Sequence, residues 1–222
     1  IRHVIENLTF TSSIYEMNTL NEIRYVPYAN NTNLDPIKRK GLDVDFNYNL
    51  DKKTSIDGSF SYIDAYFTSG SLSRGMFQGT YAANSTTASE RMDSSRNLDD
   101  GTYNIAGLKV PLVAEYAYNL GLEYKMPKDI NLKLEMSFVD EMFVSNDQEN
   151  IEPTIPSYYL FDLSLDAKND YGAWSFGIDN IFNTSYYTFA VASASHGDSS
   201  YGIQNMYPLE RRSIFLDYFY EF

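Results

Sequence analysis

The last nine residues, 214–222, constrain the fold more than any other stretch of this sequence. Side chains alternate along a β-strand with a period of two, so one face of a strand here would be entirely apolar or aromatic. That face would consist of Ile214, Leu216, Tyr218, Tyr220 and Phe222. Nine residues at about 3.3 Å each cover about 30 Å, and a strand tilt near 40° reduces the height to roughly 23 Å. This height matches the apolar band of an outer-membrane β-barrel strand, while an ordinary edge strand is the alternative.

The same alternation recurs through the chain and is clearest in residues 42–50, where Leu, Val, Phe and Tyr alternate with Asp and Asn. The segments that predict strands are 4–15, 42–50, 54–68, 112–126, 130–138, 159–165, 174–178 and 214–222. Residues 22–27 are expected to extend the first strand, and residues 30–33 have the composition of a turn. No segment has a helical period. The sequence therefore predicts an all-β fold of about eight antiparallel strands.

The connections between these segments alternate in length. Those near residues 51, 128 and 169 are short, whereas those near 30, 90, 150 and 195 are longer. Short turns at one end and long loops at the other are typical of outer-membrane barrels. Aromatic residues are predicted at both ends of the strands, as in the girdles of such barrels. Those at the loop end are Tyr116, Tyr158, Tyr159, Tyr186 and Tyr207, and those at the turn end are Tyr124, Trp174, Tyr220 and Phe222.

Composition excludes several classes of protein. The net charge of −13 argues against nucleic-acid binding, which needs a basic surface. The absence of cysteine rules out a disulfide framework and thiolate metal sites. No run approaches the ~20 apolar residues of a transmembrane helix. The chain has no starting Met and no signal peptide, and we expect an N-terminal part to be missing. A soluble β-sandwich remains the alternative fold.

Four passages resemble the C-terminal part of TonB-dependent outer-membrane receptors. They are residues 33–45 with a basic-Gly-hydrophobic-acidic strand opening, 110–124, the hairpin-like stretch 159–187, and 208–213 leading into the aromatic terminus. The likeness covers most of the chain. It implies that residues 1–222 form the C-terminal part of a transmembrane β-barrel of 22 strands, without the plug and the segment that contacts TonB.

The resemblance also implies location and partners. The expected location is the bacterial outer membrane, and the expected function is active uptake of a scarce ligand, a ferric siderophore first, then haem or cobalamin. The expected partners are the TonB complex, outer-membrane lipid and lipopolysaccharide, and the barrel-assembly machinery, whose recognition signal the terminal Tyr218, Tyr220 and Phe222 resemble. The alternative function is a small structural or adhesive barrel that closes on itself and transports nothing.

No arrangement of a nucleophile and a base appears, so we expect no enzymatic activity, no cofactor and no metal site. Asp93, Asp99 and Asp100 could bind a divalent cation, but a solvated loop is the favoured interpretation. Arg211 and Arg212, above the last strand, could hold either lipopolysaccharide phosphates or lumen carboxylates.

Two long loops, 69–110 and 183–206, are the predicted ligand-binding elements. Guanidinium groups pair with anionic groups, and aromatic rings stack on planar ones. Ferric siderophores often offer both kinds of group. The predicted ligand-binding residues are Arg74, Phe77, Tyr81, Arg91, Arg96, Tyr103, His196 and Tyr201.

Overall fold

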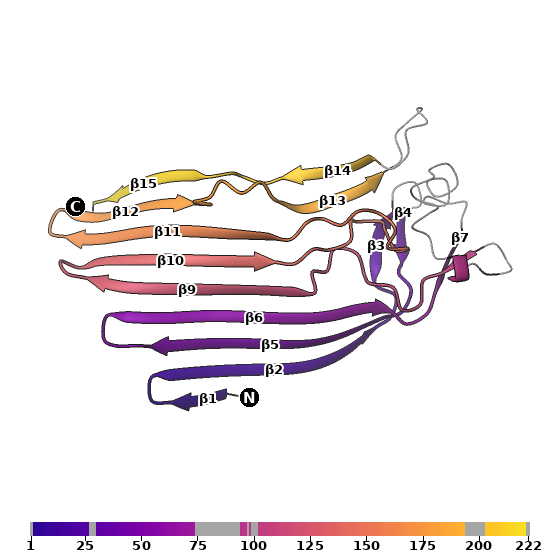
Figure 1. Cartoon of the computed structure of the whole chain (residues 1–222), viewed down its shortest axis with the longest axis horizontal. Coiled ribbons are helices and arrows are strands. Elements are labelled where there is room, and N and C mark those ends of the chain that lie inside the picture. Colours follow the sequence, from indigo (N-terminus) through magenta and orange to yellow (C-terminus); the bar gives the residue numbers. More distant parts are fainter. Residues whose placement is uncertain are drawn as a thin grey trace.

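The computed structural model describes residues 2–26, 30–73, 94–96, 98, 102–193 and 203–220. Its main feature is a nine-stranded antiparallel sheet in the order β1-β2-β5-β6-β9-β10-β11-β12-β15. β1 and β15 are the two edges of this sheet, which is open (Figure 1). The predicted all-β antiparallel fold is therefore confirmed. No helix in the described part of the chain is long and apolar enough to span a bilayer.

The sheet strands are β1 (Arg2–Ile5), β2 (Leu8–Thr19), β5 (Ile37–Asn49), β6 (Thr54–Phe67), β9 (Tyr116–Met126), β10 (Ile130–Val139), β11 (Tyr158–Asn169), β12 (Gly172–Asp179) and β15 (Ser213–Phe219). Three two-stranded hairpins accompany it: β3 (Ile23–Val26) with β4 (Asn30–Asn33), β7 (Ser71–Ser73) with β8 (Thr102–Asn104), and β13 (Tyr187–Ser193) with β14 (Ile203–Pro208). One 3-10 turn, η1, covers Ser94–Arg96.

The two ends of the sheet differ as the connection lengths predicted. Short turns join β1 to β2, β5 to β6, β9 to β10 and β11 to β12 at one end, here called the turn end (Figure 1). The three extra hairpins and the β10–β11 loop, residues 140–157, lie at the opposite end, here called the loop end.

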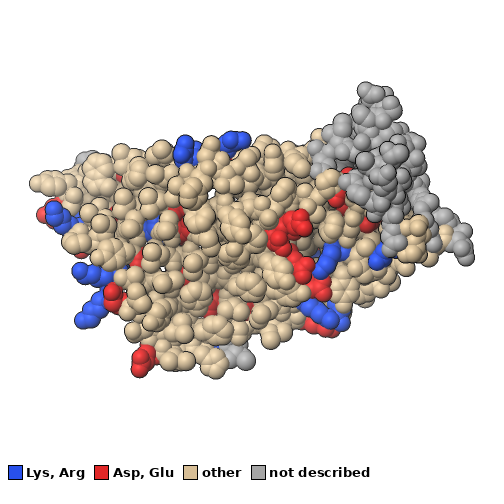
Figure 2. Space-filling view, viewed as in Figure 1, with Lys and Arg blue, Asp and Glu red and all other residues tan. Residues whose placement is uncertain are grey.

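Most strands of the sheet have one largely polar and one largely apolar face. The register aligns Asp45 with Ser59, Ser59 with Asn119, and Asn119 with Ser137, so these side chains share the polar face. The apolar face leaves large hydrophobic side chains exposed: Leu120 is 43% exposed and Leu216 is 66% exposed. In Figure 2 most of the visible charged side chains gather toward the two ends of the sheet. The alternation predicted from the sequence is therefore confirmed, and the strands present an apolar band to the outside.

Aromatic rings lie near both ends of the strands. At the turn end the rings of Trp174 and Tyr218 are 4.2 Å apart, and the Tyr218 hydroxyl donates to the Tyr171 carbonyl. Toward the loop end, Tyr62 and Tyr116 are 5.1 Å apart, and Tyr158 and Tyr186 are 4.8 Å apart. Phe222 lies outside the described residues.

Several predicted boundaries are wrong. The strand expected at 4–15 is a hairpin, because Glu6 has a left-handed φ of 44° and Ile5 pairs with Leu8. Residues 23–26, in the stretch expected to extend the first strand, form β3 of the β3–β4 hairpin and continue the line of β2, since Ile23 pairs with Asn33 in the same register in which Thr19 pairs with Ile37. The Leu34 N–H donates to the Glu22 carbonyl at 2.7 Å between these pairs, so the expectation is confirmed for the described residues. The Asn-rich stretch 30–33, expected to be a turn, is β4 of this hairpin. Local turn preference is overridden here by a strand partner.

The strand expected at 112–126 begins at Tyr116, because residues before it belong to the loop end. Leu112 has a φ of 61°, and its N–H donates to the Phe143 carbonyl at 2.9 Å. The longer connection expected near residue 150 is largely buried between residues 146 and 152.

Two apolar clusters form the core, and both lie at the loop end. The first, here called cluster A, buries Ile37, Ala65, Phe67, Tyr103, Ile105 and Val110. The second, cluster B, buries Met142, Val144, Ile155 and Ala190. Backbone hydrogen bonds from Phe67 N–H to the Leu108 carbonyl and from Val110 N–H to the Ala65 carbonyl, both 3.0 Å, pair residues 108–110 with the end of β6. The loop end therefore has a packed interior of its own.

Candidate functional site

A cleft of about 300 Å³ lies at the loop end between the two clusters. Its apolar walls come from Ile63, Ala65, Val113, Met142 and Phe143. Its polar groups come from Lys109, Glu115, Asp140, Glu141 and Thr154. Pockets with apolar walls and a few converging polar groups are the usual form of small-molecule sites. This cleft is the strongest candidate site in the described part of the chain.

Lys109 is the cation of this cleft. Its Nζ lies 2.8 Å from Asp64 Oδ1 and 3.2 Å from Glu115 Oε2. Partial burial acts to lower the pKa of Lys109, but hydrogen bonds to the two carboxylates outweigh it and raise the pKa above its usual value. Lys109 is therefore charged at neutral pH. Because one ammonium serves two carboxylates and its side chain is 41% exposed, it can exchange partners with an anionic group of a ligand.

Two of the predicted ligand-binding residues are described, and both hold the loop together. Tyr103 is 2% exposed and lies in cluster A, so its ring cannot stack on a ligand in this arrangement. Arg96 Nη1 donates to the carbonyls of Asn104 at 3.3 Å and Ala106 at 2.8 Å, which ties η1 to the segment after β8. Both side chains therefore stabilise the loop, Arg96 by hydrogen bonds and Tyr103 by packing. The composition of the loop alone does not separate such a structural role from contact with a ligand.

The other predicted ligand-binding residues, Arg74, Phe77, Tyr81, Arg91, His196 and Tyr201, lie outside the described residues. The same holds for Asp93, Asp99 and Asp100, the cation site considered from the sequence. Among the residues that the structure does describe, no three His, Asp or Glu side chains are grouped so that they could hold a metal ion.

The polar face of the sheet is acidic and internally hydrogen-bonded. Serine hydroxyls donate to carboxylates on the neighbouring strand in three places: Ser61 to Asp43 at 2.6 Å, Ser175 to Asp166 at 2.7 Å, and Ser213 to Asp179 at 2.9 Å. On the same face Lys133 Nζ lies 2.8 Å from Glu135 Oε1. Such groups need a polar environment, so this face cannot meet hydrocarbon.

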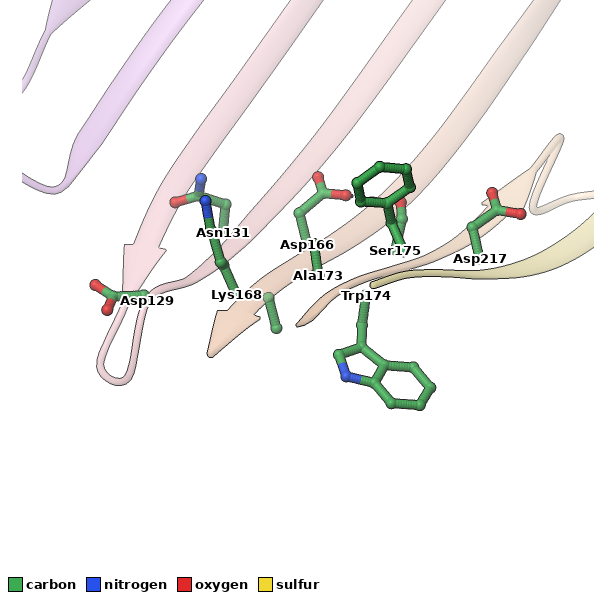
Figure 3. Close-up of a pocket in the computed structure, with 10 residues that line it drawn as sticks. Asp129, Asn131, Asp166, Lys168, Ala173, Trp174, Ser175 and Asp217 are labelled. Carbon is green, nitrogen blue, oxygen red and sulfur yellow. Dashed lines mark hydrogen bonds between the residues drawn. The ribbon is translucent and has the colours of Figure 1, made fainter. Parts of the chain in front are cut away.

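A second hollow, of about 240 Å³, lies at the turn end of this face. In Figure 3 the side chains of Asp166 and Asp217 project to one side of the sheet, whereas Trp174 projects to the other. Asp129 and Lys168 also line the hollow. Three carboxylates with one ammonium make this end of the polar face net negative.

The cleft has no signature in the sequence. Lys109 and Asp64 are 45 residues apart, and Lys109 and Asn150 are 41 apart, so only the fold brings them together. A Lys followed six residues later by a Glu is not a recognisable motif. Only the length of the loop at residues 69–110 predicted that a site would lie at this end of the sheet.

Comparison with known proteins places this architecture in a family. A family model described as TonB dependent receptor-like, beta-barrel, matches residues 3–181. No curated protein sequence matches the chain.

Solved structures share the fold. The siderophore receptor PiuA from Acinetobacter baumannii is 20% identical over 95% of this chain and 25% of its own, with a TM-score of 0.65. The ferric yersiniabactin uptake receptor FyuA from Yersinia pestis is 14% identical over 97% of this chain and 28% of its own, with a TM-score of 0.67. The copper transporter OprC is 14% identical over 97% and 28%, with a TM-score of 0.61.

At these identities the structural likeness shows the fold alone, and the chain spans about a quarter of the length of PiuA. The family match is independent of that likeness and covers most of the sequence. It agrees with the antiparallel sheet, the short turns opposite long loops and the apolar outer band. The chain belongs to the TonB-dependent receptor β-barrel family.

Proposed function

We propose that this chain forms part of the wall and mouth of an outer-membrane active transporter in a bacterium. The family match over residues 3–181 is the observation that carries the proposal. The apolar face of the sheet, with Leu120 and Leu216 exposed, supports contact with lipid. The loop end is then the extracellular mouth, since short turns are periplasmic in outer-membrane barrels.

The proposed ligand is a ferric siderophore, with haem and cobalamin as the other ligands to be tested. PiuA and FyuA, two proteins of similar fold, are a siderophore receptor and a ferric yersiniabactin receptor. In this chain the ligand would enter the cleft beside Lys109 and meet the loops that contain Arg74, Arg91 and His196. The ammonium and guanidinium groups would pair with anionic groups of the chelate. Arg96 and Tyr103 support the loop in this scheme and do not contact ligand.

The closed-barrel alternative has less support. A structural barrel of eight strands needs its first and last strands to pair with each other. The main sheet has nine strands, and its edges β1 and β15 do not pair in the described residues. An open sheet of this kind fits a wall segment of a larger barrel.

The proposed partners follow from this placement. The TonB complex would act through another part of the protein, and the barrel-assembly machinery would recognise the terminal strand through Tyr218, Tyr220 and Phe222. Lipid would contact the apolar face. Arg211 and Arg212, both exposed just before the terminal strand, would contact either lipopolysaccharide phosphates or lumen carboxylates.

Uptake tests the ligand proposal. Growth on ferric siderophores, haem and cobalamin is compared between a strain with the intact gene, a null strain, and a strain whose receptor lacks residues 74–93. This deletion spares Leu72, Tyr103 and Ile105, which pack in or against cluster A. We expect uptake of one ferric siderophore to need both the gene and the loop. If uptake depends on the gene but survives the deletion, the protein is a transporter and the loop residues do not bind the ligand. If growth on every ligand is independent of the gene, the proposal is wrong.

A separate experiment tests the assembly signal. Removing Phe222, or changing it to Asp, should lower the yield of the folded, heat-modifiable form in the membrane. The matched control is Asp217→Asn on the polar face of β15, which should leave that yield unchanged. Normal yield from both Phe222 variants would reject the signal.

A further inference from the structure

The β10–β11 loop, residues 140–157, connects two other parts of the loop end. The Ser145 N–H donates to the Ala190 carbonyl in β13 at 2.8 Å. On its other side, Asn150 binds the backbone of Lys109 in both directions: its Oδ1 accepts from the Lys109 N–H at 2.7 Å and its Nδ2 donates to the Lys109 carbonyl at 3.0 Å. This one loop therefore links β13 to the segment that contains Lys109.

The interior of the loop is unusually polar. Asn146, Asp147, Gln148, Glu149 and Glu152 are each at most 8% exposed. Asp147 is fully buried, and its carboxylate accepts from the N–H groups of Ile151 at 3.0 Å and Glu152 at 3.1 Å. This carboxylate organises the backbone of the loop.

Glu149 differs from Asp147. It is 8% exposed, and its Oε2 is buried without a hydrogen-bond partner. Burial, and after it the carboxylates of Asp147 and Glu152, raise the pKa of Glu149 to about 8, against the opposing effect of a hydrogen bond from its own N–H. A buried carboxyl with an unpaired oxygen and no cation beside it among the described residues favours its neutral form, because a poorly compensated buried charge is very costly.

Among the residues that the structure describes, no charged group on a neighbouring element compensates Glu149. The segment before β9 offers Lys109, whose ammonium is paired with Asp64 and Glu115. In the described parts of β13 and β14 the titratable groups are Tyr187 and Tyr207. Within the described residues, the charges that act on Glu149 are the two like charges of its own loop, Asp147 and Glu152.

We propose that Glu149 is a proton-controlled latch for the mouth, which holds residues 146–152 in place while its carboxyl is neutral. When the carboxyl ionises, desolvation and repulsion from Asp147 and Glu152 drive this segment out. The clamp between Asn150 and Lys109 and the contact between Ser145 and Ala190 then open together. This inference concerns loop packing and is independent of which ligand the protein takes.

The direction of the pH dependence follows from linkage. The packed loop binds the Glu149 proton more tightly than the open loop, where the pKa is the ordinary 4.5. The stabilisation of the packed loop by the Glu149 proton is complete below pH 4.5. It is lost as the pH rises to about 8 and does not fall further above that pH. Opening should therefore become more frequent between pH 6 and pH 8, by a factor on the order of 10 to 100.

Amide hydrogen exchange on the complete receptor in lipid vesicles tests the latch. Protection of residues 141–156, corrected for the intrinsic pH dependence of exchange, is measured at pH 6 and pH 8. We expect protection of the wild-type loop to fall by a factor on the order of 10 to 100 from pH 6 to pH 8. Glu149→Gln keeps the shape of the side chain without its charge, and it should remain protected at both pH values.

Glu141→Gln is the matched control, because Glu141 is an exposed carboxyl of the same loop that accepts a hydrogen bond from Thr154 at 2.8 Å. It should retain the wild-type pH dependence. A wild-type protein with equal corrected protection at both pH values would overturn the proposal whatever the variants do. The same holds if Glu149→Gln loses protection between pH 6 and pH 8 as the wild type does.

Discussion

The nine-stranded sheet, here called the wall, and the loop end contain similar apolar side chains. Those on the wall are exposed, whereas those at the loop end are buried. On the wall, Ile214 and Leu216 are each 66% exposed. At the loop end, Phe67 and Ile155 are 0% exposed, and they belong to clusters A and B. The polar residues are reversed as well, since Asp217 is exposed on the polar face of the sheet whereas Asp147 is fully buried.

This difference fits a chain whose loop end lies in water and whose apolar sheet face lies in hydrocarbon, as proposed above for an outer-membrane protein. In water, apolar surface is driven inward, and the loop end obeys this rule by forming packed clusters. The wall is stabilised by its ladder of backbone hydrogen bonds and exposes its apolar face, as is suitable where the surroundings are hydrocarbon. The boundary between the regions lies near the loop-side ends of β6 and β10, where regular pairing gives way to clusters A and B. Four substitutions, in order of decreasing effect, test this division.

The largest effect is expected at the loop end. Phe67→Ala empties the centre of cluster A and should destabilise the loop end by about 3–5 kcal/mol. Phe182→Ala is the matched control, because Phe182 is 69% exposed, and it should cost far less. Amide exchange in residues 102–113 reports the loss. Similar effects of the two changes would mean that cluster A does not act as a core.

On the wall the vulnerable face is the exposed one. Leu120→Arg places a charge in the apolar band and should cost about 2–4 kcal/mol near mid-bilayer. The neighbouring Asn119→Arg enters the polar face, where Asn119 Nδ2 donates to Ser59 Oγ at 3.2 Å, and should cost much less. Reversible unfolding in lipid vesicles measures both. Equal costs would show that the assignment of faces is wrong.

A smaller effect is expected from the clamp between loops. Asn150 has a left-handed φ of 54°, which glycine adopts readily, so Asn150→Gly removes the side chain without adding backbone strain. Losing both hydrogen bonds to Lys109, and the one that Asn150 Nδ2 donates to the Asp147 carbonyl at 3.1 Å, should cost about 1–3 kcal/mol. Amide exchange should then rise in residues 108–112 and 142–152 together. Exchange that rises in one segment alone would indicate that the two are not coupled.

The smallest effect on stability is expected at the cleft. Lys109→Met removes an ammonium whose partners Asp64 and Glu115 are about one-third exposed, and pairs of this kind contribute about 0–1 kcal/mol. The melting temperature should therefore change little, while affinity for an anionic ligand falls. Glu123→Gln, on the polar face of β9 away from the cleft, should leave affinity unchanged. A large drop in stability with unchanged affinity would make Lys109 a structural residue.

The sequence determined the wall almost completely. Alternation with a period of two, as in residues 42–50, specifies both the strand and the face that each side chain takes. Turn residues such as Lys128 and Asp129, both at positive φ, mark where strands reverse. These signals are local, so the strands, their antiparallel order and the two faces could be predicted. The hairpin at Glu6 was missed because its short turn interrupts an otherwise continuous alternation.

Only the tertiary structure decided the loop end. Composition predicts that a stretch such as 145–152, with Asn, Asp, Gln and Glu, is solvated, yet Asp147 and Glu149 are buried there. Arg96 and Tyr103 have the chemistry of ligand contacts, yet backbone carbonyls and cluster A engage them. Burial at this end depends on contacts between residues about 40 positions apart, as for Asn150 with Lys109, and no local pattern encodes such pairing. The alternation of polar and apolar residues specifies a strand, because it is local in the sequence. The packing of several loops against one another is decided only when the whole chain has folded.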